Sequence, residues 1–81
     1  MIPLSRLQRL EINGLLSESP DIWERYPVLR HVDLSDNDLT TLPESFYTLR
    51  NLEYINLTNN PLSDETIFRL EQAFPNAVLW Y

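Results

Sequence analysis

Three residue types that build nucleophilic catalytic sites alternate along one short segment of the chain. His31, Asp33 and Ser35 lie two residues apart, as they would on one face of a β-strand. Residues at this spacing are about 6.6 Å apart on an extended strand, which is too far for the mutual hydrogen bonds of a catalytic triad. We therefore expect no catalytic residues here and predict that the chain is not an enzyme.

Metal and phosphate chemistry also lack a suitable set of residues. The acidic run around Asp36 resembles the start of a calcium loop, but Thr41 stands where that loop needs glycine, and its twelfth position is not a glutamate. The chain has no cysteine, and its only histidine is His31, so a zinc site would depend on carboxylates alone. The single glycine, Gly14, excludes a glycine-rich phosphate loop. We expect no metal site and no cofactor.

The composition narrows the classes of partner. The 81 residues include 12 acidic residues against 6 arginines and no lysine, for a net charge of −6. This charge argues against binding to nucleic acid or to anionic membranes. The sequence has no apolar run long enough to predict a membrane span, no secretory signal pattern and no cysteines for a disulfide scaffold. We expect a small cytoplasmic domain.

An eleven-residue pattern occurs twice, 23 residues apart. Residues 29–39 and 52–62 both fit L-x-x-L-x-L-x-x-N-x-L, with valine or isoleucine at the second leucine position. Residues 7–12 begin a weaker copy 22 residues upstream of the first, which has Leu15 at the asparagine position. A terminal repeat with a degraded pattern is typical of the cap of a repeat protein.

Over essentially its whole length the chain resembles the leucine-rich repeat family. Besides the two repeats, residues 42–52 carry Leu-Pro, then Phe three residues after the proline, then Leu-x-x-Leu. This segment is similar to the 22–23-residue repeats of bacterial effectors and of plant and animal intracellular members. The tail, with Phe-Pro-Asn before an apolar segment, is similar to the carboxyl-terminal caps of bacterial members.

The resemblance implies an α/β fold. We expect a short leucine-rich repeat solenoid, with a parallel β-sheet on its concave face and short helical or irregular segments on its convex face. The chain would form a single domain, residues 1–81. Its predicted parts are a degenerate amino-terminal repeat or cap (1–28), a repeat (29–51), a repeat with a helix (52–76) and a cap strand (77–81).

Several residues have predicted structural roles. Asn37 and Asn60 follow the strands and should form a ladder that satisfies backbone groups of neighbouring turns. A helix is expected over 63–74, capped by Ser63 and ended by Pro75. A shorter helical segment over 19–26 should be capped by Ser19, with Pro20 at its first position. Large side chains are expected in the convex core (Trp23, Phe46 and Phe74) or over the carboxyl-terminal edge of the core (Trp80 and Tyr81).

The side chains that point away from the core should form a small concave face. The resemblance implies that this face holds a protein partner, and it mixes aromatic, basic, acidic and amide groups. The predicted partner-binding residues are Arg9, Glu11, His31, Asp33, Ser35, Asp36, Tyr54, Asn56 and Thr58. We expect noncatalytic protein–protein recognition. The alternative is a structural unit that self-assembles into a homo-oligomer, or a fragment of a larger effector or receptor.

Overall fold

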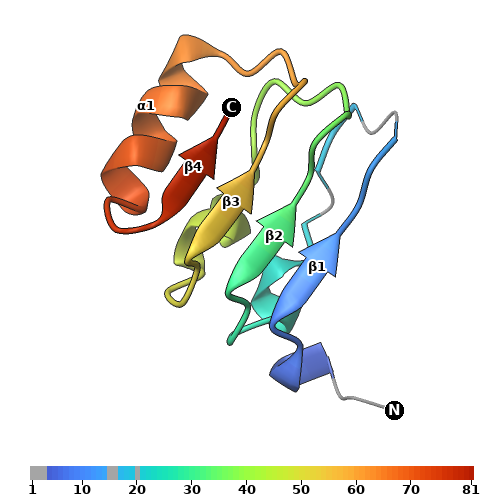
Figure 1. Ribbon diagram of the computed structural model, residues 1–81, viewed down its shortest axis with the longest axis vertical. Coiled ribbons are helices and arrows are strands. Elements are labelled where there is room, and N and C mark those ends of the chain that lie inside the picture. Colours follow the sequence, from blue (N-terminus) through green and yellow to red (C-terminus); the bar gives the residue numbers. More distant parts are fainter. Residues whose placement is uncertain (1–3, 15–16, 20) are drawn as a thin grey trace.

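The computed structural model describes residues 4–14, 17–19 and 21–81. Its centre is a sheet of four parallel strands in the order β1-β2-β3-β4, each three residues long (Figure 1). The strands are β1 (Arg9–Glu11), β2 (His31–Asp33), β3 (Tyr54–Asn56) and β4 (Val78–Trp80). The helical elements are η1 (Leu4–Arg6), η2 (Trp23–Arg25), η3 (Glu44–Thr48) and α1 (Asp64–Ala73). The predicted parallel sheet with short helical connections is confirmed.

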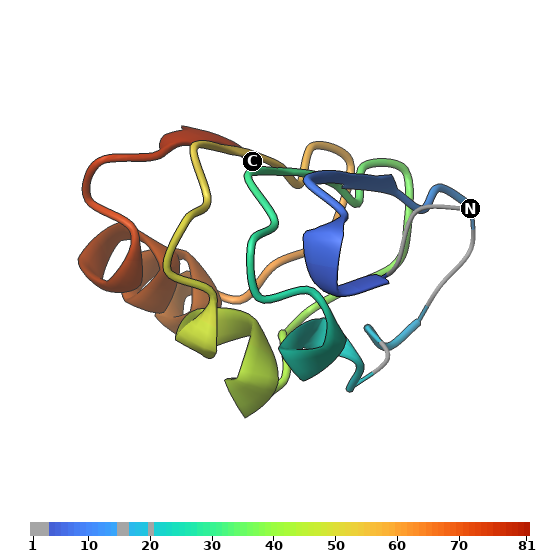
Figure 2. The same cartoon turned by 90° about the horizontal axis from the view of Figure 1, so that it is seen from below.

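The helical segments lie together on one side of the sheet, and the other side is open (Figure 2). Register partners follow one another across the sheet, so that His31 pairs with Tyr54 and Tyr54 with Val78. The successive partners are 22, 23 and 24 residues apart along the chain, which is the spacing of the sequence repeats. Stacking of one repeat on the next therefore builds the fold. We call the side of the sheet without helices the open face; it is the predicted concave face.

The hydrophobic core lies between the sheet and the helical segments. Val32 and Ile55, the central residues of β2 and β3, are fully buried in it. From the opposite side, Trp23, Phe46 and Phe74 are buried as predicted. Phe46 meets Trp23 edge to face at 5.0 Å between ring centroids and Phe74 at 5.8 Å. This geometry is a favourable one for aromatic rings, so these rings join the three return segments into one core.

Helix α1 confirms the prediction for residues 63–74. The Ser63 hydroxyl oxygen accepts a hydrogen bond from the Thr66 backbone N–H at 3.2 Å and caps the first turn. Leu70 and Phe74 are buried, and the helix ends at Ala73, before Pro75. No helix among the described residues is long and apolar enough to cross a membrane.

The predicted helix over 19–26 is wrong in its length and in its cap. Among the described residues of this segment only the three-residue turn η2 is helical, and no side chain caps it. The Ser19 hydroxyl oxygen instead accepts a hydrogen bond from the Trp23 indole N–H at 3.1 Å. A buried indole N–H needs a hydrogen-bond partner, and the Ser19 hydroxyl supplies it. Pro20 and Leu15 lie outside the described residues.

The predicted role of the last two residues is also wrong. Trp80 is 45% exposed and lies on the open face, because β4 continues the alternation of β3 and turns Leu79 toward the core. Tyr81 is 52% exposed, and its hydroxyl donates a hydrogen bond to a Glu71 carboxylate oxygen of α1 at 2.9 Å. Neither ring covers the edge of the core.

Candidate functional site

The open face carries two columns of side chains that cross all four strands. The register pairs bring together Arg9, His31, Tyr54 and Val78 in one column and Glu11, Asp33, Asn56 and Trp80 in the other. Every one of them is more exposed than the central residue of its strand, as the pleat of a half-buried sheet requires. Six of these eight residues are predicted site residues, and the sheet does bring them side by side.

Sequence reasoning missed Val78 and Trp80. Both are exposed, and the fourth strand adds them to the carboxyl-terminal end of the face. Their place follows from the register of the structure, in which Leu79 takes the place in β4 that Ile55 takes in β3. The prediction of a strand over 77–81 did not say which of its side chains would face the core and which the open face.

An exposed row of rings runs over the carboxyl-terminal half of the open face. The rings of Tyr54 and Trp80 stack with 6.2 Å between centroids and 13° between planes. On the other side of Tyr54, the His31 ring lies 5.3 Å away. Tyr54 is 43% exposed, and Val78 beside it is equally exposed. We call His31, Tyr54 and Trp80 the aromatic row.

The ends of the strands carry a hydrogen-bonded cluster around Asp33. One carboxylate oxygen accepts hydrogen bonds from the Ser35 backbone N–H at 2.9 Å and from the Ser35 hydroxyl at 2.6 Å. It also accepts one from the Asn13 side-chain amide at 3.3 Å, and the second oxygen accepts one from the Asn56 amide at 3.4 Å. We call Asn13, Asp33, Ser35 and Asn56 the Asp33 cluster.

The expectation that Asp33 and Ser35 are too far apart to interact is wrong. It assumed an extended strand, but β2 ends at Asp33 and the chain turns, so Ser35 folds back and is buried. The pair is still no catalytic triad, because among the described residues no hydrogen bond joins His31 to either of them. His31 instead contacts the Tyr54 ring.

The Asp33 carboxylate is held in its charged form. Partial burial acts to raise its pKa, but the hydrogen bonds from Ser35, Asn13 and Asn56 outweigh this effect and hold the pKa below its usual value. The next repeat uses the same motif, since the Asn56 amide oxygen accepts hydrogen bonds from the Thr58 backbone N–H at 3.1 Å and from the Thr58 hydroxyl at 2.8 Å. Four predicted partner-binding residues thus bond within the chain: Asp33, Ser35, Asn56 and Thr58.

Two asparagines form the rungs of a ladder behind the strand ends. The Asn37 amide donates to the carbonyl oxygens of Ile12 and Leu34 at 2.9 and 2.8 Å. The Asn60 amide donates to those of Leu34 and Leu57 at 2.8 and 2.9 Å, and its oxygen accepts from a backbone N–H, that of Leu39, at 3.0 Å. Each asparagine therefore joins its own turn to the preceding repeat, as the sequence pattern predicts.

A second row of turn residues precedes the asparagine positions. Gly14, Asp36 and Asn59 occupy equivalent places, and all have positive φ angles, of 109°, 59° and 61°. Glycine, aspartate and asparagine tolerate this backbone region best. The Asn59 amide donates to an Asp36 carboxylate oxygen at 2.7 Å. Asp36 is exposed at this turn. Its positive φ angle already explains the choice of aspartate, so the residue type does not by itself indicate partner binding.

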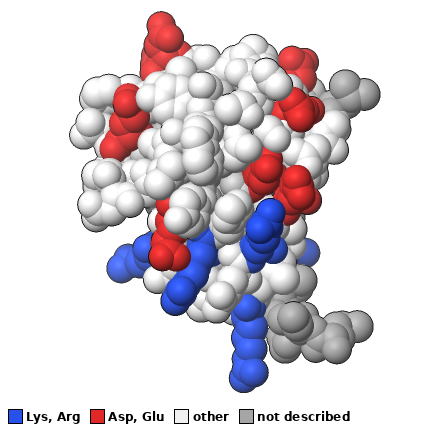
Figure 3. All heavy atoms as spheres, in the orientation of Figure 1, with Lys and Arg blue, Asp and Glu red and all other residues white. Residues whose placement is uncertain are grey.

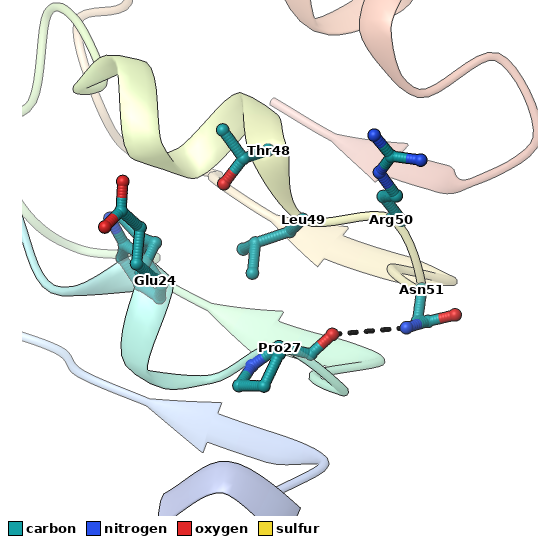
Figure 4. Close-up of a pocket in the computed structure, with 7 residues that line it drawn as sticks. Glu24, Pro27, Thr48, Leu49, Arg50 and Asn51 are labelled. Atoms are coloured by element: carbon teal, nitrogen blue, oxygen red, sulfur yellow. Dashed lines mark hydrogen bonds between the residues drawn. The ribbon is translucent and has the colours of Figure 1, made fainter.

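The far end of the open face is polar. Arg9 and Glu11 are exposed on β1, and within the described part of the chain neither makes an ion pair. The described residues also contain no group of three or more potential metal ligands. A hollow of about 310 Å³ lies on the side of the helical segments, between η2 and the segment that leads into β3 (Figure 4). It is lined by Glu24, Pro27 and Arg50 among others and lies away from the open face.

Comparisons with known proteins agree with this geometry. A family model for the leucine rich repeat matches residues 3–62. The chain is 37% identical over 62 residues to a flightless-1 homolog of Caenorhabditis elegans, with 76% of this chain covered. It is 42% identical over 67 residues to a leucine-rich repeat and WD repeat-containing protein of Mus musculus, with 78% covered. A putative disease resistance protein of Arabidopsis thaliana is 39% identical over 56 residues, with 69% covered.

A solved structure has the same fold. An LRR protein of Leptospira interrogans superposes on 86% of this chain with a TM-score of 0.77 and 28% sequence identity. The chain covers 18% of that protein and 5% to 10% of the three sequence relatives. The repeat pattern, the four-stranded parallel sheet and the family match agree, and the chain belongs to the leucine-rich repeat family.

Proposed function

We propose that the chain binds a protein partner through its open face, with Tyr54 and Trp80 as the anchors. The observation that carries this proposal is the stacked pair of half-exposed rings on adjacent strands of the sheet. Tyrosine and tryptophan dominate binding energy at protein interfaces, and rings that are already stacked lose little freedom when a partner covers them. The family match supports the coarser conclusion that the chain is a protein-interaction repeat module.

The remaining residues of the open face have distinct proposed roles. Arg9, Glu11 and His31 would form a polar rim around the anchors, because they are accessible and are not bonded to other described side chains. Asp33 and Asn56 would instead hold the strand ends in place, since their oxygens already accept hydrogen bonds from Ser35 and Thr58. Recognition would need no catalytic group.

The test is capture from the source lysate, followed by an affinity measurement with the purified partner. The Tyr54→Ala/Trp80→Ala variant should lose the partner that the wild-type chain retains. Phe68→Ala is the matched control, because Phe68 is 64% exposed on α1, on the helical side of the sheet, and should retain it. All forms must first show equal thermal unfolding. Equal capture by the wild-type chain and the double variant would refute the proposal that Tyr54 and Trp80 anchor the partner.

Self-assembly is a second candidate because β4 is an edge of the sheet. Within the described residues no further strand pairs beyond β4, so the outer side of this strand has no strand partner. A second copy that added its β1 there would continue the solenoid. Light scattering separates the two candidates: a monomer mass at high concentration contradicts self-assembly, and a larger mass that Trp80→Glu reduces supports it.

A further inference from the structure

The charges of the chain are strongly polarised along the strand direction. We define the amino edge as the segments that lead into the four strands, together with Arg9, the first residue of β1; these are residues 5–9, 23–30, 48–53 and 74–77. The amino edge holds five of the six arginines and two glutamates, whereas the rest of the chain holds one arginine and ten acidic residues. The five arginines are Arg6, Arg9, Arg25, Arg30 and Arg50. In Figure 3 the arginine atoms gather at the end of the sheet where the strands begin.

Most of these arginines have no carboxylate partner among the described residues, although acidic residues outnumber arginines two to one. In the described part of the amino edge only Arg30 approaches a carboxylate, 4.0 Å from Glu53, and both side chains are more than half exposed. An ion pair of this kind contributes little to stability. Arg69, outside the edge, donates two hydrogen bonds to the Glu44 carboxylate. Within the described part of the chain the amino edge therefore keeps unneutralised positive charge.

The edge also offers a hollow of suitable chemistry. A depression of about 430 Å³ lies where the chain enters β3 and β4, and Arg30, Arg50, Asn51, Glu53 and Asn76 are among its lining residues. Arginine presents a planar fork of donors that matches the two oxygens of a carboxylate, and side-chain amides add further donors. Figure 4 shows Arg50 pointing away from Pro27, while the adjacent Asn51 donates to the Pro27 carbonyl oxygen at 3.2 Å.

We propose that the amino edge binds an acidic segment of a protein, with its carboxylates in the hollow between Arg30 and Arg50. The net charge of −6 does not prevent this. The molecule extends 36 × 27 × 19 Å, whereas salt screens charges beyond about 8 Å at physiological ionic strength, so the acids at the far ends of the strands are largely screened. A long polyanion such as DNA would extend past the edge onto the acidic remainder and be repelled. Arg9 belongs to both surfaces, whereas Arg30 and Arg50 do not belong to the open face.

The probe is a labelled oligo-glutamate peptide, followed by fluorescence anisotropy at low and physiological salt. Binding should saturate, weaken as salt rises, and shift the NMR signals of the Asn51 and Asn76 side-chain amides. Arg50→Gln should weaken it about fivefold and Arg30→Gln/Arg50→Gln at least about tenfold, since each removes a charge-assisted contact. Arg69→Gln is the matched control: it makes the same change in net charge away from the hollow and should alter affinity less than about twofold.

Several outcomes would overturn the proposal. One is no binding at low salt, and another is an equal loss of affinity in Arg50→Gln and Arg69→Gln, which would indicate overall charge alone. NMR shifts confined to the open face would place the peptide elsewhere. Equal competition by inorganic phosphate or by single-stranded DNA would show a general anion surface instead of one for acidic protein segments. Failure here leaves the partner site on the open face untouched, because the two tests use different residues.

Discussion

The aromatic row and the Asp33 cluster lie on the same face of one sheet, yet they use their side chains in opposite ways. In the Asp33 cluster, hydrogen bonds inside the chain occupy both carboxylate oxygens of Asp33. In the aromatic row, Tyr54 and Trp80 stack on each other and leave nearly half of each side chain exposed. The difference teaches that position on the open face does not decide function. Asp33 and Asn56 hold the strand ends by hydrogen bonds within the chain, whereas Tyr54 and Trp80 remain half-exposed.

The largest effect on stability is expected behind the strands, at the asparagine ladder. Asn60→Ala would leave the Leu57 carbonyl oxygen and the Leu39 N–H without the side-chain partner that Asn60 supplies, and the Leu34 carbonyl oxygen would keep only Asn37. We expect a loss of about 2–3 kcal/mol in the free energy of unfolding, measured by urea denaturation. Asn51→Ala, which removes one exposed hydrogen bond, is the control and should cost less than about 1 kcal/mol. Equal losses would contradict a ladder that holds the repeats together.

The Asp33 cluster should give the next largest effect. Asp33→Ala removes the acceptor for Ser35, Asn13 and Asn56, and we expect a loss of about 1–3 kcal/mol in the free energy of unfolding. Asp33→Asn keeps an acceptor oxygen, as Asn56 does in the next repeat, and should lose about half as much. If Asp33→Ala unfolds like the wild-type chain, the cluster is not structural and Asp33 returns to the set of partner-binding residues.

The pH dependence of unfolding should report the same cluster. The pKa of Asp33 is lower in the folded chain than in the unfolded chain, so the cluster stabilises the fold above the ordinary pKa. This stabilisation is lost as the pH falls from about 4 through the folded pKa. The Arg69 hydrogen bond lowers the pKa of Glu44 with the same sign. In Asp33→Asn, the urea concentration at the unfolding midpoint should fall less steeply as the pH is lowered below about 4. Adding Glu44→Gln should reduce the remaining dependence on pH. The same pH dependence as in the wild-type chain for both variants would contradict these pKa shifts.

The smallest effect on stability is expected in the aromatic row. Tyr54→Ala and Trp80→Ala each remove a half-exposed ring and the stacking contact between them, and Tyr54→Ala also removes the contact with His31. Each should cost about 1 kcal/mol or less. A double-mutant cycle should show a coupling of about 0.5–1 kcal/mol between them. Thermal unfolding checks both values. A loss above about 3 kcal/mol in either single variant would mean that the ring belongs to the core.

Much of the fold follows from the repeat pattern. Val32 and Ile55 alternate with neighbours that are less buried, and a period of two predicts their burial on a strand. Asn37 and Asn60 recur at one place in the repeat, and Ser63 precedes the first turn of α1, so hydrogen bonding and capping rules apply directly. These features depend on contacts between residues that are close in sequence, or on contacts that recur from one repeat to the next.

The wrong predictions concern residues whose local pattern is overridden by another contact in the folded chain. Ser19 does not cap a helix, because the buried indole of Trp23 takes its oxygen. Ser35 leaves the open face, because the turn after β2 brings it back to Asp33. Trp80 reaches the open face through the register of β4 against β3, which a short apolar tail does not determine. The aromatic row as a unit could therefore be seen only in the structure.

The most direct test of the account is a photo-crosslinker placed in the aromatic row. Tyr54 replaced by p-benzoylphenylalanine keeps a ring at the site, and Phe68, which is more exposed than Tyr54, supplies the control on α1 when it is replaced in the same way. Irradiation in the source cells should join a protein partner to the chain from position 54 and not from position 68. The same partner joined only from position 68, or from neither position while the wild-type chain still captures it, would contradict recognition through the open face.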